Sequence, residues 1–219
     1  MSRLFAIGDI HGCDVALAAL LQWMSPTADD IVVTLGDYID RGPNSRGVVD
    51  QLIALNQRTQ WVGILGNHEE MMLDVIEGRL PYMEWIKHGG VETLDSYGFD
   101  GTMDFLPVEH REFYASLGDY FETDGFFFTH ANFDGDVPLD QQSVDALRWR
   151  SLIQSVPMPH LSGKIGVVGH TAARDGEVVQ GGHYFCIDTY CYGGGWLSAL
   201  DLVNNHLYQV DRDGNRRGG

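Results

Sequence analysis

Short apolar runs alternate with amphipathic stretches along the first third of the chain. The predicted strands are 4–7, 31–35 and 61–65, and the predicted helices are 14–24, 45–55 and 71–76. The runs are rich in β-branched and aromatic residues, as in buried strands, whereas the stretches between them repeat apolar positions at helical spacing. This β-α-β-α-β-α order predicts parallel strands joined by right-handed crossovers.

The pattern changes in the middle of the chain. Residues 79–122 carry Trp85 and an amphipathic stretch around Phe113, and we expect a mostly helical cap insertion there. Further strands are predicted at 126–129, 165–168, 184–187, 196–202 and 207–210. Residues 1–219 are therefore expected to form one α/β (α+β) domain, with a second sheet from the second half packed on the first and helices at the flanks.

Composition narrows the class of protein. The 219 residues carry a formal net charge of -17, which disfavours broad binding to nucleic acid or to anionic membranes. No apolar run approaches the roughly 18 residues of a membrane span, and the N-terminus has no signal-peptide pattern. The three cysteines are odd in number and form no CxxC pair, which favours a reducing compartment, the cytoplasm.

Polar side chains stand at the carboxyl ends of five predicted strands. They are Asp9, Asp37, Asn67, His130 and His170, and four of the five follow a glycine. Any one of them alone is better explained as a turn former or a hydrogen-bonded core residue. Because open α/β sheets bind ligands at the carboxyl ends of their strands, five such coincidences favour a functional site.

Together with His11, these residues offer the mixed oxygen and nitrogen ligands that hard or borderline dications bind. Six ligands suit two ions about 3.5–4 Å apart, with Asp37 as the natural bridge. Such a pair would lower the pKa of a bridging water for attack on a phosphate. His68 is then the expected general acid, Asp40 the carboxylate that orients it, and Arg41 a clamp for phosphate oxygens.

These residues also spell three ordered motifs: GDIHG at 8–12, GDYIDRG at 36–42 and GNHE at 66–69. The chain thereby resembles the phosphoprotein phosphatases, a family of dinuclear metallophosphoesterases, and most of all their bacterial and bacteriophage members. The resemblance implies the calcineurin-like two-sheet fold and gives the same roles: Asp9, His11 and Asp37 on one metal, Asp37, Asn67, His130 and His170 on the other. It also implies two divalent ions, with manganese expected and iron or zinc as alternatives.

A second phosphate-binding arginine is implied in the segment Leu147–Arg150, where the family's spacing is shifted by one residue. An ungapped match favours Arg150 over Arg148. His88 is expected either to hydrogen-bond substrate or to be a surface histidine, and Tyr190 either to narrow the pocket or merely to pack.

The function implied is a serine/threonine protein phosphatase, with phosphotyrosine as a further substrate and a phosphoprotein or phosphopeptide as partner. One alternative is a symmetrical dinucleoside tetraphosphate hydrolase on the same scaffold. Another is a catalytically dead binding module, which the presence of His68, Asp40 and every ligand disfavours. The sequence predicts no oligomeric state.

Overall fold

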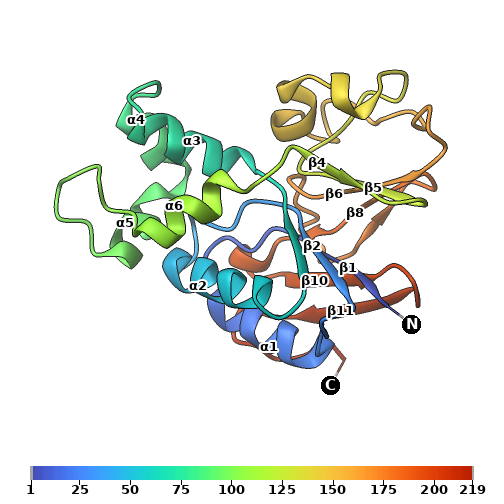
Figure 1. Ribbon diagram of the computed structural model, residues 1–219, viewed down its shortest axis with the longest axis horizontal. Coiled ribbons are helices and arrows are strands. Elements are labelled where there is room, and N and C mark those ends of the chain that lie inside the picture. Colours follow the sequence, from blue (N-terminus) through green and yellow to red (C-terminus); the bar gives the residue numbers. More distant parts are fainter. Residues whose placement is uncertain (1, 219) are drawn as a thin grey trace.

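The computed structural model describes residues 2–218 (Figure 1). Its first sheet has the order β11-β10-β1-β2-β3, with β9 paired to β10. The strands are β1 (Leu4–Ile7), β2 (Ile31–Thr34), β3 (Gln60–Gly63), β9 (Asp188–Thr189), β10 (Trp196–Asp201) and β11 (His206–Val210). β1, β2 and β3 are parallel, as the alternating pattern predicts, so their carboxyl ends share one edge.

The second sheet has the order β4-β5-β6-β8-β7. Its strands are β4 (Tyr120–Glu122), β5 (Phe126–Thr129), β6 (Ile165–Val168), β7 (Val179–Gln180) and β8 (Tyr184–Cys186). The three central strands are parallel and the two edge strands antiparallel.

The helices lie mainly on the first sheet and beside it (Figure 1). They are α1 (Asp14–Met24), α2 (Ser45–Asn56), α3 (Asn67–Ile76), α4 (Tyr82–Trp85), α5 (Val91–Tyr97) and α6 (Val108–Ala115). Shorter helical turns are η1 (Ile86–Gly90), η2 (Leu139–Gln141), η3 (Asp145–Trp149) and η4 (Cys191–Gly193). α2 begins where the sequence offers a cap, because the Asn44 side chain accepts a hydrogen bond from the Gly47 amide at 3.0 Å.

Strand alternation builds three apolar layers. In β1, Leu4 and Ala6 face the second sheet, whereas Phe5 and Ile7 face the helices. The layer between the sheets joins Ala6 and Val33 of the first to Phe128 and Val167 of the second, and it includes Ile64 just after β3 and Ile187 between β8 and β9. The third layer lies on the outer face of the second sheet, under the segment drawn in yellow in Figure 1. Both faces of the central strands are thus covered, which explains their continuous apolar runs.

The two-sheet α/β fold with flanking helices is confirmed, but one assignment within it was wrong. The predicted strands at 196–202 and 207–210 join the first sheet, not the second, because β10 pairs antiparallel with β1 through Phe5–Asp201 and Ile7–Ala199. Local periodicity shows that a segment is a strand, whereas the choice of pairing partner depends on contacts distant in sequence.

Residues 79–122 form α4, η1, α5 and α6 and end in β4, an edge strand of the second sheet. In residues 2–218 no helix is long and apolar enough to span a membrane.

Candidate active site

The loops that follow β1, β2, β3, β5 and β6 bring their polar side chains to one place. Asp9, Asp37, Asn67 and His130 are buried, and His170 is half-buried. Much of the backbone here is left-handed, since Asp37 has a φ of 50° and His170 one of 61°. Such conformations cost free energy in non-glycine residues and concentrate at functional sites.

Gly36 shows why a glycine precedes Asp37. Its φ is +100°, and a Cβ atom there would lie 2.7 Å from the Gly66 nitrogen and 2.9 Å from Nδ1 of His130. Only glycine allows the loops after β2 and β3 to approach the histidine this closely.

One group of candidate metal ligands joins the two sheets. Ligand atoms of Asp37, His130 and His170 lie within 4.8 Å of one another. His130 Nδ1 is 2.7 Å from the Leu35 carbonyl oxygen, so it carries the proton and leaves the Nε2 lone pair facing inward. Nε2 lies 3.4 Å from Asp37 Oδ1 and 3.0 Å from Asn67 Oδ1.

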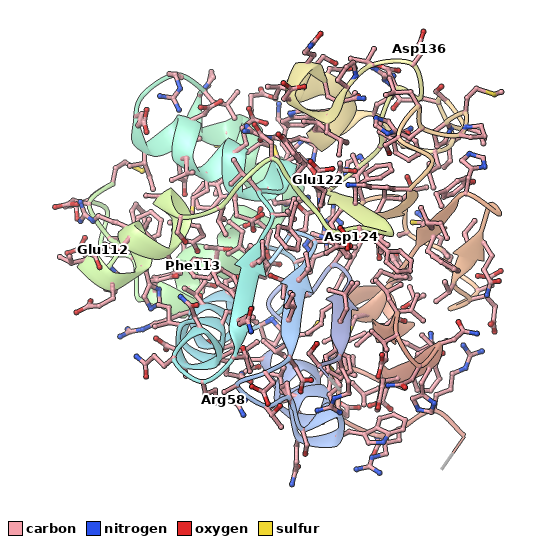
Figure 2. The ribbon with its side chains drawn as sticks, turned by 45° about the vertical axis from the view of Figure 1, so that its right-hand side comes forward. Arg58, Glu112, Phe113, Glu122, Asp124 and Asp136 are labelled. Atoms are coloured by element: carbon pink, nitrogen blue, oxygen red, sulfur yellow. The ribbon has the colours of Figure 1, made fainter. Side chains whose placement is uncertain are left out.

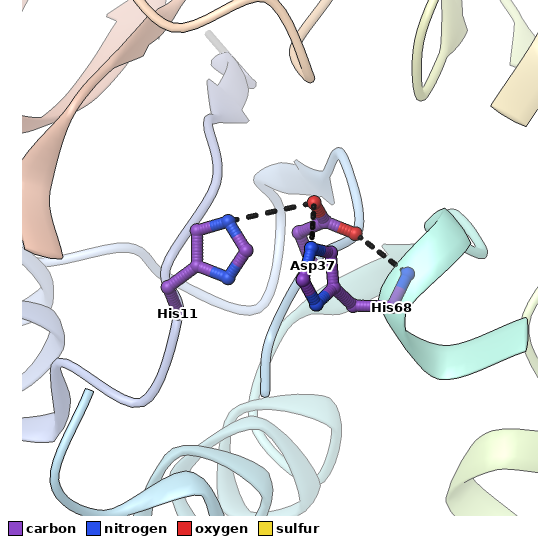
Figure 3. A group of neighbouring side chains, drawn as sticks. All are labelled: His11, Asp37 and His68. Atoms are coloured by element: carbon purple, nitrogen blue, oxygen red, sulfur yellow. Dashed lines mark hydrogen bonds and ion pairs between the residues drawn. The ribbon is translucent and has the colours of Figure 1, made fainter. Parts of the chain in front are cut away.

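The second group is built by the first sheet alone. His11, Asp37 and His68 again offer ligand atoms within 4.8 Å (Figure 3). His11 Nδ1 is 2.8 Å from the Ile39 carbonyl oxygen, so Nε2 faces Asp37 Oδ2, 3.5 Å away. Asp37 belongs to both groups, which is the position that the predicted bridging ligand requires.

Asp9 is not a member of either group, but it lies close enough to Asp37 and Asp188 for their charges to act on it. Both of its carboxylate oxygens accept from the His170 amide, at 3.1 and 3.0 Å. Burial, Asp188 and Asp37 raise the pKa of Asp9 well above its usual value. Burial also raises the pKa of Asp188 to about 6. The buried carboxylates thus repel one another, and a cation would relieve that repulsion.

The donor set fits metal ions. Burial lowers the pKa of His11 and of His130, and lowers that of His170 to about 4, so the rings are neutral and can offer lone pairs. Around His130 Nε2 the neighbours are the acceptor oxygens of Asp37 and Asn67 and the Nδ1 atom of His170, 3.2 Å away. The lone pairs of these acceptor atoms repel one another, and a cation bound between them would relieve the repulsion.

His68 and Asp40 form a buried pair beside these groups. His68 Nδ1 is 2.6 Å from Asp40 Oδ2. The cap segment fixes the carboxylate, since Thr93 Oγ1 donates to Oδ1 at 2.6 Å and Trp85 Nε1 donates to Oδ2 at 2.9 Å. The sequence does not indicate these two partners, because an isolated Trp or Thr in a helical stretch carries no signal of a distant carboxylate.

Arg41 lies against the two histidines of the group formed by His11, Asp37 and His68. Its guanidinium contacts His11 Nε2 at 2.9 Å, His68 Nε2 at 2.8 Å and the Tyr192 hydroxyl at 3.0 Å. Three of its five N–H groups are therefore engaged, and two have no partner among residues 2–218. These two can donate to phosphate oxygens. Tyr192 also packs its ring against the guanidinium carbon at 4.7 Å, a contact that the sequence did not suggest.

The downstream arginines are occupied elsewhere. Arg150 pairs with Asp134 and Asp145, and Arg148 pairs with Asp119 and with Glu70 at 3.0 Å. Neither guanidinium contacts the candidate ligands, so Arg150 as a phosphate-binding residue stays a prediction.

Two further residues have defined surroundings. His88 is exposed, and its ring lies edge-on to that of His68, 6.3 Å between centroids. Tyr190 has a left-handed φ of 65° and stands edge-on to Tyr192 at 4.8 Å. Both residues therefore border the site, and their roles stay predictions.

Glu69 holds the loop after β2 in place. Oε2 accepts from the amides of Asp37 and Gly66 at 2.9 and 3.1 Å, and Oε1 accepts from those of Tyr38 and Ile39 at 2.8 and 3.3 Å. Burial and Asp37 raise the pKa of Glu69 to about 8, while these amide donors oppose the shift. Its position in GNHE was visible in the sequence, but its partners were not.

The sequence profile of the calcineurin-like phosphoesterases matches residues 2–208. The chain belongs to this family of metallophosphoesterases, whose members use two metal ions, in agreement with the two His/Asp groups.

Among curated proteins, a symmetrical bis(5'-nucleosyl)-tetraphosphatase of Burkholderia pseudomallei is 30% identical over 162 residues, which are 69% of this chain and 52% of that protein. The same enzyme of Burkholderia mallei matches equally. The chain spans about half the length of these curated relatives.

Solved structures share the fold. That of a proposed diadenosine tetraphosphatase has a TM-score of 0.72 at 23% identity, covering 95% of this chain and 93% of its own. A cold-active protein-tyrosine phosphatase of a psychrophilic Shewanella has a TM-score of 0.70 at 17% identity, with 99% and 80% covered. A serine/threonine phosphatase of Saccharomyces cerevisiae has a TM-score of 0.59 at 15% identity, with 92% and 73% covered.

Proposed function

We propose that this chain is a metal-dependent phosphomonoesterase that removes phosphate from serine and threonine side chains of proteins, and from tyrosine as a secondary substrate. The observation that carries the proposal is the buried His68–Asp40 pair, 2.6 Å between Nδ1 and Oδ2, beside two groups of metal-competent donors that share Asp37. A proton donor next to a dication site is what cleavage of an alkyl phosphate needs, because the alkoxide is a poor leaving group.

Two divalent ions, manganese in our proposal, would supply Lewis acidity and a water of lowered pKa. Asp9, His11 and Asp37 would hold one, and Asp37, Asn67, His130 and His170 the other. The protein itself orients the ligand side chains. Neutral imidazoles present lone pairs at fixed positions, because backbone carbonyls hold the Nδ1 protons of His11 and His130.

His68 acts as the general acid toward the leaving oxygen. Asp40 accepts the Nδ1 proton, so an imidazolium formed by protonation at Nε2 is stabilised by the carboxylate 2.6 Å away. In the neutral ring Nε2 accepts from Arg41 at 2.8 Å, so protonation at Nε2 would release this N–H, and it and the two free N–H groups of the guanidinium would bind phosphate oxygens. Arg150 is proposed as a second clamp that exchanges Asp134 for phosphate.

The substrate class rests on the motifs GDxHG, GDxxDRG and GNHE, which resemble those of phosphoprotein phosphatases. The three cysteines are free and buried, which supports the reducing cytoplasm as the place of action.

A second candidate, symmetrical hydrolysis of dinucleoside tetraphosphates, is favoured by the names of the curated relatives. Its reaction would use the same metals and the same acid, so the substrate alone separates the two functions.

The test is a side-by-side assay of the manganese-loaded protein on phosphoserine, phosphothreonine and phosphotyrosine peptides and on diadenosine tetraphosphate. We expect kcat/KM to be highest for phosphoserine or phosphothreonine. A kcat/KM that is 100-fold higher for the dinucleotide would replace the first function by the second; no turnover of any phosphate ester would refute both.

A further inference from the structure

The exposed large apolar side chains of the molecule are unevenly distributed. Twelve such residues are exposed in the described chain, and six of them fall in the 18 residues from 144 to 161. Four of these lie close together in sequence, and we call them the apolar loop surface: Ile153 at 88% exposure, Val156 at 65%, Met158 at 72% and Leu161 at 58%. Apolar residues gathered this densely on a surface mark interaction sites more often than chance exposure does.

The apolar loop surface borders a groove rather than a flat face. Val156, Met158 and Leu161 line a depression of about 520 Å³ together with Asp134 and Asp136. The groove lies on the outer side of the second sheet, where Asp136 projects from the edge of the molecule (Figure 2).

Hydrogen bonds fix this segment to residues one and two positions after the candidate metal ligands His170 and His130. The Leu152 amide donates to Thr171 Oγ1 at 2.9 Å, next to His170. The Ser155 carbonyl accepts from Asn132 Nδ2 at 2.8 Å, two residues beyond His130. The segment is therefore held in a fixed position relative to the site, although it has no regular secondary structure.

The charge around the groove is negative. Asp136 lines the groove, and Asp140 lines a neighbouring depression that shares Leu161 with it; both are exposed and have no ion-pair partner in residues 2–218. The two nearby arginines do not offset them, because Arg148 is paired with Asp119 and Glu70 and Arg150 with Asp134 and Asp145. An occupant should thus combine apolar side chains with lysine or arginine.

A second copy of this chain fits poorly. It would bring its own acidic rim and a net charge of -17 against the first. A nucleic acid is disfavoured by the same charge. A basic polypeptide meets both requirements. A protein substrate of the proposed phosphatase would bring such a polypeptide to the candidate active site.

We propose that the apolar loop surface docks the polypeptide around the phosphorylated residue, and that it selects substrates carrying both apolar and basic residues near the phosphate. This inference rests on the proposed protein phosphatase function and adds a specificity determinant outside the catalytic machinery. Small phosphate esters would not reach the surface, so their hydrolysis would be independent of it.

The test compares V156S/M158S with V203S in the manganese-loaded full chain. Val203 is 53% exposed in the turn between β10 and β11 and is the matched control. Because two exposed apolar side chains that a bound peptide would cover are lost, kcat/KM for a phosphoserine peptide with leucine and arginine flanks should fall about 10-fold in the double variant, mainly through KM. The V203S variant should match wild type, and p-nitrophenyl phosphate should be hydrolysed equally by all three.

A second experiment changes the charge of the peptide. Exchange of arginine for glutamate in the peptide should lower wild-type kcat/KM about 10-fold, and D136K should reverse part of that loss. Equal effects of V156S/M158S and V203S, or preference for the glutamate peptide, would overturn the docking proposal while leaving the phosphatase function intact.

A binding measurement separates the two proposals. Fluorescence anisotropy with the unphosphorylated basic peptide requires no catalysis, and we expect V156S/M158S to weaken binding about 10-fold. If no phosphopeptide is hydrolysed but this binding is seen, the phosphatase function fails and the docking surface stands. Unchanged binding, or a dimer in sedimentation that V156S/M158S dissociates, would refute the docking proposal.

Discussion

The two sides of the site are built in different ways. The side from the first sheet is closed: Asp40 is completely buried and held by Thr93, Trp85 and His68, and Glu69 accepts four backbone amides. The side from the second sheet ends in Arg148 and Arg150, which pair with carboxylates near the surface. The proposed acid is thus preorganised, whereas the proposed second clamp, Arg150, would have to exchange its carboxylate partners before it could bind phosphate.

Removal of metal should have the largest effect, since both sides of the site meet at Asp37. Dialysis against a chelator is expected to abolish hydrolysis of any phosphate ester, and manganese to restore it, because without dications no water is activated. Metal content by mass spectrometry should rise to two ions per chain on reconstitution. Full activity of the metal-free protein would remove both metal groups from the mechanism.

The second-largest effect is expected from loss of the proposed general acid, His68. The His68→Asn variant should lower kcat for a phosphoserine peptide by about 10²–10⁴-fold, which is the usual contribution of a positioned acid. The metal content of the variant should stay near that of wild type, because His68 is expected to transfer a proton rather than bind metal. Unchanged kcat would exclude His68 as the acid; loss of one ion would make it a ligand.

The closed side should also depend on Glu69 for stability. In Glu69→Gln, one carboxylate oxygen becomes an NH₂ group that faces backbone donors, so above pH 8, where Glu69 is ionised, the free energy of unfolding should fall by about 1–3 kcal/mol. Glu70→Gln is the matched control, since Glu70 is its neighbour but is partly exposed and pairs with Arg148. Denaturant melts of the two variants that coincide would show that the four amide contacts contribute nothing specific.

The smallest effect is expected on the open side. Arg150→Ala should raise KM for phosphate esters several-fold, and more than Arg148→Ala does, if Arg150 exchanges Asp134 for phosphate. Initial-rate kinetics on p-nitrophenyl phosphate are sufficient to measure this. The reverse order would assign the second clamp to Arg148.

The same contrast explains how far the sequence alone could lead. The two-sheet fold and the convergence of five strand ends follow from apolar runs, glycines and the charges after them, which are local signals. The partners of Asp40 could not be predicted, because Trp85 and Thr93 lie 45 and 53 residues away within ordinary helices. Tyr192 and the placement of β10 beside β1 likewise depend on packing between distant segments.

The carboxylate partners of Arg150 could not be predicted from the sequence either. An arginine next to any of several aspartates in the 134–145 loop looks the same in sequence, whereas the structure selects Asp134 and Asp145. For this reason the ligand positions could be proposed from motif and strand order, but the second clamp could not be fixed.

The central claim is that the His68–Asp40 pair protonates the leaving group. The most direct test is whether the loss of kcat in His68→Asn depends on the leaving group. Wild type and His68→Asn are compared on p-nitrophenyl phosphate, whose leaving group needs little protonation, and on a phosphoserine peptide, whose alkoxide needs it fully. The account predicts that the variant loses at least 10-fold more kcat on the peptide than on the aryl ester. Equal losses on both substrates would contradict it.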